Sequence, residues 1–378
     1  MATDAAPPDI AVVGGGITGM ATALRLADNG ARVTIFDAER NAGSTVNAGS
    51  LHVQLQSRFL RLYPDEAPNL EASLPLYAAA VAHWEGLAER LGGVELTRKG
   101  GLMLAESDDQ RAFLFQKAER EAKKGLDVDI LERDALERIA PWLGPQVIAA
   151  ELCRNEGKLN PLAANRAMRT LLASAGVTLR RTEVLRVEPD NTGVAIVTRD
   201  ATVRADRAVL ATSWGTRALA ETVGARIPVA WEPLHMNITE PADYVIEHLV
   251  QHAERPITLK QFRSGQIVIG GGWEARFVPE HGTPEVLESS LLGNVALAAR
   301  LAPGIRDLRL IRTWAGLNTT TDGKSIIGPL PSAPRITIAV PGDAGYTLGP
   351  LVGTIAADVV LGRVPQVDPA PFSPARFG

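Results

Sequence analysis

The sequence predicts an α/β protein in which a Rossmann-like dinucleotide-binding domain is interleaved with a second domain. Three observations lead to this prediction: an N-terminal strand–turn–helix–strand unit, a length of 378 residues, and no linker-like segment near the middle of the chain. A single hydrophobic core stops growing at about 250–300 residues, so a chain of this length is expected to form two domains. Because no linker separates them, the two domains are expected to share the chain in alternating segments.

The N-terminal unit extends from Asp9 to Asp37. An apolar strand, a glycine turn, a helix and a second strand follow one another, and the turn fits the pattern G-x-G-x-x-G at Gly14, Gly16 and Gly19. Asp37 follows the first glycine by 23 positions, near the roughly 20 expected of a dinucleotide fingerprint. A glycine cluster alone could be an ordinary turn, but here the whole context of the fingerprint is present.

Each part of this unit has a physical role in holding a dinucleotide. Gly14 permits the tight turn, Gly16 lets backbone N–H groups approach a pyrophosphate, and Gly19 lets the helix pack closely on the strand. The start of the helix supplies partial positive charge for the phosphates. Asp37 can accept hydrogen bonds from a ribose diol and disfavours a 2′-phosphate. NADP is therefore the least expected ligand, and this unit leaves NAD or FAD open.

Composition bears on several classes of protein. Hydrophobic residues make up 46% of the chain, which is sufficient for globular cores. The formal charge of −4, without a long run of one sign, provides no electrostatic footprint for nucleic acid. The single cysteine, Cys153, excludes an internal disulfide and a cysteine-cluster metal centre, and core packing is expected for it. The N-terminus lacks a signal-peptide pattern and no stretch approaches the ~18 apolar residues of a membrane span, so we expect a cytoplasmic protein.

Three further regions have predicted structures. Residues 44–52 are polar and rich in small side chains, so they form either a surface loop or a backbone that lies flat against a bound ring system. Residues 74–91 have the apolar spacing of a helix. Residues 336–340 are expected to be the last core strand, followed by a glycine loop at 342–345 and a last helix at 351–361.

Several motifs beyond the glycine turn resemble those of a known family. They are Ser-x-x-Asn-Ala-Gly at 44–49, Gly-Lys-Leu-Asn-Pro at 157–161, Arg-Ala-Val-Leu-Ala-Thr-Ser-Trp at 207–214, the segment 312–329, and Pro-Gly-Asp-Ala-Gly-Tyr-Thr-Leu-Gly at 341–349. In this order, over nearly the whole chain, they resemble the FAD-dependent oxidoreductases of the D-amino-acid oxidase, glycine oxidase and sarcosine oxidase group. Residues 47–54 are similar in particular to the catalytic subunits of octopine- or nopaline-type opine oxidases and dehydrogenases, and to the β-subunits of proline and hydroxyproline dehydrogenases.

The resemblance implies a D-amino-acid oxidase-like fold, in which a Rossmann-like FAD-binding domain is interleaved with a β-rich substrate domain of α+β type. The FAD-binding domain would comprise residues 1–90, 152–224 and 312–378, and the substrate domain residues 91–151 and 225–311. The implied cofactor is FAD. It would be held without a covalent bond, because Ala315 and Gly316 stand where monomeric sarcosine oxidases place their flavin-linking cysteine.

The implied cofactor contacts come from these motifs. Tyr346 and Thr347 are expected in a glycine-flanked loop that wraps the isoalloxazine ring. The full set of expected cofactor-binding residues is Gly14, Gly16, Ile17, Thr18, Gly19, Asp37, Ala38, Ser44, Thr45, Asn47, Ala48, Gly49, Leu51, Val184, Ala211, Thr212, Trp214, Gly316, Gly342, Gly345, Tyr346 and Thr347.

The implied reaction oxidises a carbon next to an amine: a hydride leaves that carbon for flavin N5, and water hydrolyses the resulting imine. The protein must then supply a pocket, groups that bind the substrate carboxylate, and selection of the neutral amine. The candidate catalytic residues are His52, Lys260 and Tyr346. Lys260 stands where family members often place a cation facing the substrate, or it is a solvated strand lysine. His52 could contact the ring or the substrate, attach the flavin covalently, or be a hydrogen-bonded loop histidine.

Five other residues have candidate roles. Arg58, Arg61 and Arg312 could bind a carboxylate, although a surface position is expected for the first two and an ion pair would explain the third. His235 is expected to pack in a core. Trp273 either shapes the substrate pocket or fills the domain junction.

The expected electron acceptor follows from one departure from the family. Sarcosine oxidases place an oxygen-activating lysine on the strand that matches residues 266–270, and this strand has no lysine. We therefore expect a dehydrogenase of an opine, a D-amino acid or a proline-like amine, which passes electrons to partner subunits with further redox centres or to another acceptor. The alternatives are a direct oxidase that makes hydrogen peroxide, a flavin-holding relay subunit without a substrate, and an NAD dehydrogenase.

Overall fold

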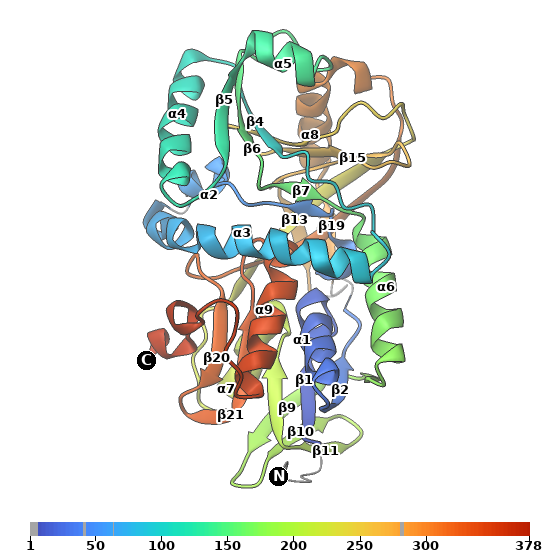
Figure 1. Ribbon diagram of the computed structural model, residues 1–378. Coiled ribbons are helices and arrows are strands. Elements are labelled where there is room, and N and C mark those ends of the chain that lie inside the picture. The colour runs from blue at the N-terminus through green and yellow to red at the C-terminus, as the bar shows by residue number, and fades with distance from the viewer. Residues whose placement is uncertain (1–6, 41–42, 63, 280–282) are drawn as a thin grey trace. The chain divides into compact units, whose positions relative to one another are not determined.

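The computed structural model describes residues 7–40, 43–62, 64–279 and 283–378, and the chain forms two compact units (Figure 1). Unit 1 comprises Met1–Thr45, Leu162–Trp231 and Thr319–Gly378, and unit 2 comprises Val46–Pro161 and Glu232–Asn318. The chain therefore passes between the units four times. This confirms the interleaving that the missing linker predicts.

Unit 1 is built on a six-stranded sheet. From edge to edge its strands are β20 (Ile326–Leu330), β21 (Ala333–Val340), β12 (Arg207–Leu210), β1 (Asp9–Val13), β2 (Arg32–Asp37) and β8 (Thr178–Arg181). Strands β21 to β8 run parallel, and β20 pairs antiparallel with β21. Because parallel strands are covered on both faces, β1 and β12 are apolar and almost wholly buried. The predicted Rossmann-like sheet is confirmed.

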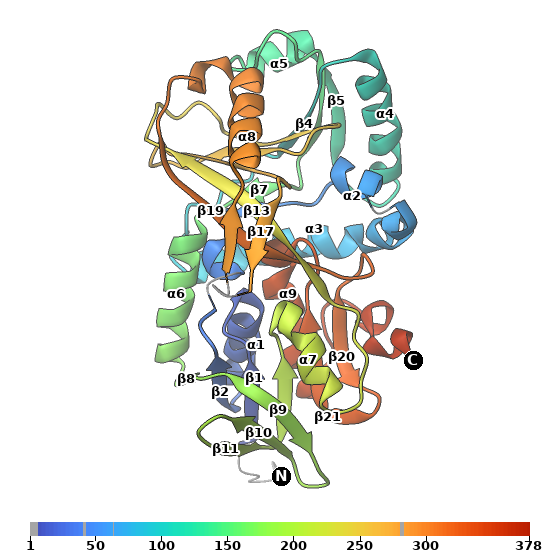
Figure 2. The same cartoon turned by 180° about the vertical axis from the view of Figure 1, so that it is seen from behind.

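Helices and a small second sheet cover this sheet. Val13, Phe36 and Leu210 pack against the antiparallel strands β9 (Val184–Pro189), β10 (Val194–Thr198) and β11 (Thr202–Ala205) and against α7 (Thr216–Glu221). Helices α1 (Ile17–Asp28) and α9 (Gly345–Val360) lie side by side, and both contact β21 (Figures 1 and 2). Helix α6 (Pro161–Ser174) belongs to this unit from Leu162 onward, and its first residue, Pro161, is counted with unit 2.

Unit 2 is built on an eight-stranded mixed sheet, which confirms the predicted β-rich domain. In order its strands are β19 (Leu310–Thr320), β13 (Ala230–Thr239), β16 (Ile267–Gly270), β15 (Thr258–Gln261), β14 (Leu249–His252), β4 (Gly101–Ala105), β6 (Ala149–Cys153) and β5 (Val128–Glu132). Successive side chains of a strand point to opposite faces. Leu102 and Leu104 accordingly share a core with α8 (Glu288–Leu301), while Met103 and Ala105 share one with α4 (Asp108–Ala122). Figure 2 shows these two helices beside the strands of unit 2.

The remaining helices and strands complete unit 2. They are β3 (Ser50–Leu51), β7 (Gly157–Lys158), β17 (Ala275–Val278), β18 (Thr283–Val286), α2 (Ser57–Leu62), α3 (Ala67–Arg90) and α5 (Arg133–Ile139). Strand β3 pairs with β7, and β17 pairs with β18. Within the described parts of the chain, no helix combines the length and the apolar character needed to cross a membrane.

Two helix predictions are wrong at their N-termini. The helix expected at residues 74–91 begins at Ala67 and contains Pro75, and the last helix begins at Gly345 and contains Pro350. Tyr346 and Thr347 therefore lie in the first turn of α9, not in a glycine loop. Proline lacks an N–H group and crowds the preceding turn, so it normally ends or kinks a helix. Here both helices bury long apolar faces that outweigh this local preference.

The predicted domain boundaries divide the chain differently from the compact units. Residues 46–90, 152–161 and 312–318 are expected in the FAD-binding domain but lie in unit 2, and residues 225–231 show the reverse. Helix α3 accounts for the largest difference, and its Glu71 and Glu85 form ion pairs with Arg120 and Arg98 of unit 2. The predicted domains are defined by whether they bind FAD or the substrate, whereas the units are defined by compactness. The predicted domain boundaries therefore stay predictions.

Glycines let α1 and α9 approach each other closely. A Cβ atom at Gly353 would lie 2.4 Å from the carbonyl oxygen of Thr18 and 2.9 Å from the amide nitrogen of Thr22. A Cβ atom at Gly349 would meet the side chain of Ile17. The close approach therefore requires that α9 has no side chains at these two positions.

We predict that Gly353→Ala lowers the free energy of unfolding by about 1–3 kcal/mol, because the added methyl group must displace the backbone of α1. The matched control is Gly86→Ala in α3, where an added Cβ meets no atom within 4 Å. The control is expected to gain about 0.5–1 kcal/mol, since alanine is the better helix former. Denaturant unfolding measures both changes, and a Gly353→Ala protein as stable as wild type would contradict the close packing.

Candidate functional site

The glycine turn joins the carboxyl ends of three neighbouring parallel strands. The amide of Gly14 donates to the carbonyl of Phe36 at 2.8 Å, and the amide of Ala211 donates to the carbonyl of Val13 at 2.8 Å. Gly14 has a φ of +107°, and a Cβ atom there would collide with the carbonyl oxygen of Ala211. Only glycine fits this position. Ligands of open α/β sheets bind at this edge, outside the carboxyl ends of the strands.

The positive end of α1 begins at a glycine. Gly16 caps the helix without a side-chain hydrogen bond, and a Cβ atom at Gly19 would overlap the carbonyl oxygen of Gly14. The amide of Ile17 donates to Ser44 Oγ at 2.9 Å. The predicted loop residue Ser44 is thus fixed beside the predicted phosphate-binding turn, where the helix dipole favours negative charge.

Asp37 lies at the end of β2, directly against the glycine turn. A Cβ atom at Gly15 would come within 2.3 Å of Asp37 Oδ2, so the missing side chain at Gly15 keeps the carboxylate accessible. Asp37 Oδ1 accepts a hydrogen bond from the amide of Glu39 at 2.9 Å. The acid expected to bind a ribose is therefore held beside the turn. The sequence pattern did not single out Gly15, although it stands inside the motif.

A chain of hydrogen bonds crosses unit 1 from Ser44 to α9. Asn165 Nδ2 on α6 donates to the carbonyl of Ser44 at 2.8 Å, and Tyr346 Oη donates to Asn165 Oδ1 at 3.0 Å. Burial raises the pKa of Tyr346 far above its ordinary value, so its phenol stays a neutral donor. Sequence reasoning missed Asn165. Its signal is a single amide within the buried stripe of α6 that Ala164, Met168 and Leu172 form.

The remaining predicted cofactor residues of unit 1 lie at strand ends and helix starts. Thr212 Oγ1 is 3.0 Å from Thr216 Oγ1, and the guanidinium of Arg40 lies 5.8 Å from the ring centroid of Trp214. The set comprises Thr18 in α1, Ala38 after β2, Thr45 in a 3-10 helix, Val184 at the start of β9, Ala211, Thr212 and Trp214 after β12, Gly342 before α9, and Gly345 and Thr347 in its first turn.

In unit 2 the continuation of the Ser44 loop brings three sequence motifs together. The amide of Gly49 donates to Asn47 Oδ1 at 2.7 Å, and the carbonyl of Gly49 accepts from the amide of Leu159 at 3.0 Å. Trp314 Nε1 donates to the carbonyl of Val46 at 2.9 Å. Strand β3 then pairs with β7. The motifs at 44–49, 157–161 and 312–329 therefore meet at this loop. Predicted cofactor residues in this unit are Asn47, Ala48, Gly49, Leu51 and Gly316.

Lys260 lies in the middle of β15 and is fully buried. Its Nζ donates to Ser50 Oγ at 2.7 Å, so it is not a solvated strand lysine. Burial, with repulsion from the buried Lys158, lowers the pKa of Lys260 to about 7. Among the residues that the structure describes, no carboxylate lies within ion-pair distance of Lys260. A buried cation without an anion is costly. Lys260 is therefore either neutral or paired with an anion that binds from outside the protein.

The other candidate residues of unit 2 have clear surroundings. His52 has 13% of its side chain exposed, and its Nδ1 lies 3.8 Å from Glu156 Oε1. Arg61 is exposed and pairs with Glu254 at 3.4 Å. The guanidinium of Arg312 lies 5.7 Å from the ring centroid of Trp314. The side chain of Arg58 lies outside the described residues.

His235, Trp273 and Cys153 belong to packed regions of unit 2. Burial lowers the pKa of His235, and the ring of Trp273 occupies the space in front of Gly293 on α8. Burial, with the nearby Glu156, raises the pKa of Cys153, so its thiol is protonated near neutral pH. Within the described ranges, no group of three or more His, Cys, Asp or Glu side chains is arranged to hold a metal ion.

The arrangement in unit 1 fits a dinucleotide. A side-chain-free turn lies at the carboxyl edge of a parallel sheet, a helix begins there, and a carboxylate stands at the next strand end. These features define a dinucleotide-binding protein. Residues 9–359 match the model of the DAO family, whose description is FAD dependent oxidoreductase, and the chain belongs to this family. The cofactor is accordingly FAD, as the motifs predict.

Comparison with individual proteins agrees with this family. The chain is 25% identical to glycine oxidase of Geobacillus kaustophilus (strain HTA426), over 97% of each chain. It is 26% identical to an opine oxidase subunit of Rhizobium meliloti, over 98% of this chain and 97% of that one. The crystal structure of glycine oxidase from Geobacillus kaustophilus has a TM-score of 0.83 at 24% identity, covering 98% of both chains. L-proline dehydrogenase from P.horikoshii has a TM-score of 0.80 at 22% identity, again covering 98% of both. These structural likenesses show the D-amino-acid oxidase-like fold.

We predict that Asn165→Ala weakens FAD binding about fivefold, because Ser44 loses the donor that holds its carbonyl, and one such hydrogen bond contributes about 1 kcal/mol. Tyr346→Phe, which removes the phenol that donates to Asn165, is expected to have a smaller effect. Thr170→Ala on the exposed side of the same helix is the control. Titration of the apoprotein with FAD, followed by flavin fluorescence, measures the affinity. Equal affinities for Asn165→Ala and Thr170→Ala would exclude this role.

Proposed function

We propose that this chain is the catalytic subunit of an FAD-dependent dehydrogenase that oxidises the carbon–nitrogen bond of an amino acid or a carboxylated secondary amine. Opines, D-amino acids and proline-like compounds are the substrate classes. The observation that carries the proposal is the fully buried Lys260, whose ammonium group donates to a serine hydroxyl at 2.7 Å and has no carboxylate beside it among the described residues. A substrate carboxylate would supply the missing anion.

The groups of unit 1 support the cofactor assignment. The turn at Gly14 and Gly16, with the start of α1, would hold the pyrophosphate, and Asp37 would bind the ribose. When bound, FAD supplies the two-electron acceptor for the oxidation. No cysteine stands in β19 (Leu310–Thr320), which supports non-covalent binding.

Three side chains have proposed roles in the reaction. Lys260 binds and orients the substrate carboxylate. His52 borders the substrate and the ring system. The hydroxyl of Tyr346 is engaged by Asn165 at 3.0 Å, so we assign Tyr346 a role in positioning the cofactor loop at Ser44 rather than in proton transfer.

The electron acceptor is proposed to be another redox centre rather than oxygen. Strand β16 (Ile267–Gly270) carries only apolar residues and glycine, which supports a dehydrogenase. The opine oxidase and sarcosine oxidase relatives from Rhizobium meliloti are both named as subunits, which supports partner subunits for this chain. A direct oxidase is the second candidate. It is favoured by the cross-strand pairing of Lys260 with Val268, which puts a cation next to the strand that lacks one.

Anaerobic mixing with an amine panel tests the proposal. We predict that amino acids, opines or proline-like amines bleach the visible flavin absorbance, while the matching amines without a carboxylate bleach it far more slowly. Oxygen consumption with the active substrate then separates an oxidase from a dehydrogenase. Flavin that no carboxylated amine bleaches would leave the relay-subunit alternative, and a colourless protein with bound nicotinamide nucleotide would overturn the assignment.

The pKa of Lys260 leads to a prediction about pH. Lys260 is protonated below its pKa of about 7 and neutral above it, so affinity for a carboxylate should fall as pH rises, by up to about tenfold per pH unit above pH 7. Acetate is a suitable probe because it carries no amine and stays ionised over this range. Its binding is followed through the flavin spectrum between about pH 6 and pH 9.

The variant Lys260→Met is expected to lose both acetate affinity and its pH dependence. Lys99→Met is the control, because Lys99 belongs to the same unit but is exposed and pairs with Glu247. An unchanged pH profile in Lys260→Met would exclude Lys260 as the carboxylate site.

A further inference from the structure

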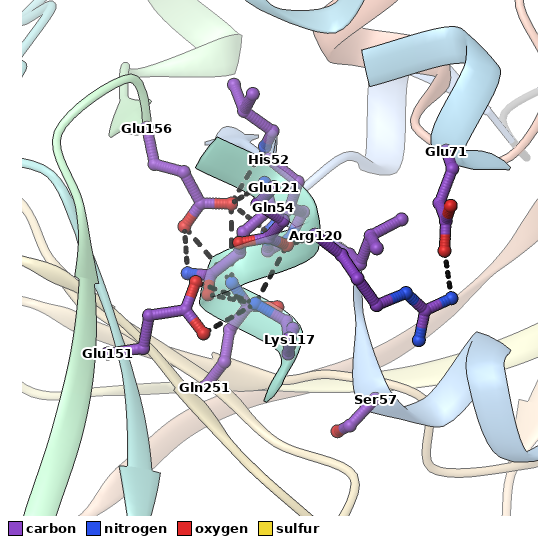
Figure 3. Close-up of polar contacts among 12 residues, drawn as sticks. His52, Gln54, Ser57, Glu71, Lys117, Arg120, Glu121, Glu151, Glu156 and Gln251 are labelled. Carbon is purple, nitrogen blue, oxygen red and sulfur yellow. Dashed lines mark hydrogen bonds and ion pairs between the residues drawn. The ribbon is translucent and has the colours of Figure 1, made fainter. Parts of the chain in front are cut away.

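A cluster of charged side chains is buried in unit 2 beside the segment that carries His52 (Figure 3). Lys117 and Glu121 come from α4, Glu151 from β6, and Glu156 from the turn that leads into β7. Each of the four residues has at most 1% of its surface exposed. Burial of a charge is costly unless it is paired and hydrogen-bonded, so four such groups in one place require an explanation.

One part of the cluster consists of Lys117 and the two carboxyl groups beside it. Lys117 Nζ lies 2.8 Å from Glu121 Oε1 and 2.9 Å from Glu151 Oε1. Burial and a hydrogen bond with Glu121 raise the pKa of Glu151 to about 9, although Lys117 acts in the opposite direction. Burial opposes the charge of Lys117, but the two carboxyl groups outweigh it and raise its pKa. Lys117 therefore stays charged while Glu151 is protonated near neutral pH.

The other part of the cluster binds backbone. Glu156 Oε1 accepts from the amides of Val53 at 2.7 Å and Gln54 at 3.1 Å, and Glu121 Oε1 accepts from the amide of Leu55 at 2.5 Å. Residues 53–55 belong to no helix or strand, so these amides lack the usual backbone partners. Buried N–H groups must find an acceptor. For these three consecutive residues, two buried carboxylates accept the amide hydrogen bonds that backbone carbonyls accept in a helix or a sheet.

The Gln54 and Gln251 side chains hold Glu156 in place (Figure 3). Glu156 Oε2 accepts from Gln54 Nε2 at 2.8 Å and from Gln251 Nε2 at 3.1 Å. Gln54 Oε1 in turn accepts from Lys117 Nζ at 3.1 Å. Glu156 thus receives two backbone and two side-chain donors in a fully buried site, where charge-assisted hydrogen bonds are strong.

His52 lies between two segments that residues 156–158 hold. On its N-terminal side, Ser50 and Leu51 pair with Lys158 and Gly157 as strands β3 and β7. On its C-terminal side, the side chain of Glu156 holds the next two amides, and His52 Nδ1 is 3.8 Å from the same carboxylate oxygen. Three consecutive residues therefore determine the backbone on both sides of the imidazole.

We propose that Glu156 is a positioning residue for His52: its carboxylate holds the backbone of residues 53 and 54, so that the imidazole keeps one orientation. The contribution of His52 to the FAD-dependent reaction rests on the proposed function, whereas the positioning itself does not. Glu156 keeps His52 in place without being part of the chemistry.

The test compares Glu156→Gln with Glu151→Gln. Both changes replace a fully buried carboxyl group of the same cluster by an amide, but only Glu156 binds residues 53 and 54. In Glu156→Gln, the new amide group faces the donors Gln54 Nε2 and Gln251 Nε2. We expect kcat with the amine substrate to fall by on the order of 10- to 100-fold, with KM changed less than about threefold, because small displacements of an active-site group have effects of this size. Glu151→Gln should keep wild-type kcat.

Nitrogen-15 NMR of histidine-labelled protein provides a readout that does not depend on catalysis. The His52 signal is assigned by its absence in His52→Gln. It should move in Glu156→Gln and stay in place in Glu151→Gln. The double variant Glu156→Gln/Gln251→Glu restores an acceptor for the new amide and should return both the signal and kcat toward wild type. Gln251→Met, which removes a single donor, is the milder variant if Glu156→Gln does not fold, and it should give an intermediate shift.

The outcomes separate this inference from the proposed function. If the wild type reacts with no amine but its His52 signal moves in Glu156→Gln or Gln251→Met, positioning holds and the proposed function fails. If the wild type is active and neither variant changes the His52 signal or kcat, Glu156 does not position His52. Equal loss of kcat in Glu151→Gln and Glu156→Gln would assign the effect to general destabilisation of the cluster and would also overturn the inference.

Discussion

Unit 1 depends on one constraint: at the carboxyl edge of its sheet, backbone must meet backbone with no side chain between. Gly14 lies against Ala211, Gly19 against the carbonyl of Gly14, and Gly353 of α9 against Thr18 of α1. A methyl group at any of these positions would collide with backbone atoms, which cannot rotate away. The same absence of side chains lets the carboxylate of Asp37 lie against the glycine turn that begins α1. The features that let the elements pack are therefore also those that suit a dinucleotide.

Unit 2 arranges its functional segment by the opposite means. The Ser44 loop continues there into a stretch that has little regular structure, and buried polar side chains bind its backbone. Asn47, Trp314, Glu121 and Glu156 each bond a backbone group between residues 46 and 55. An irregular segment buried in a protein needs such partners. The buried amine of Lys260 contacts the same loop through Ser50. In unit 1, glycines without side chains make room for the cofactor. In unit 2, buried polar and charged side chains bind the backbone of the loop.

Whether a residue's role could be predicted depends on how far away in the sequence its partners lie. Gly14, Gly19 and Asp37 were predictable because one strand–turn–helix–strand unit contains a partner of each: Gly14 bonds Phe36, Gly19 lies against Gly14, and Asp37 lies against Gly15. Asn165 was not, since its partners Ser44 and Tyr346 lie 121 and 181 positions away. The early start of α9 was missed for a similar reason: Pro350 argues against a helix locally, and only packing against α1 overrides it. Lys260 meets its partner Ser50 only in the fold, because the two residues lie 210 positions apart in the sequence.

The sequence by itself determined the dinucleotide-binding turn and the strands of the parallel sheet around it, because these depend on local periodicity and on a motif that contains partners of its own residues. Only the tertiary structure decided which charged residues are surface groups and which are buried. Lys117, Glu121, Glu151, Glu156 and Lys260 look no different in the sequence from solvated charges, yet all of them are inaccessible to solvent. The physical reason is that a buried charge is made tolerable by its neighbours in space, and the fold, not the order of residues, supplies those neighbours.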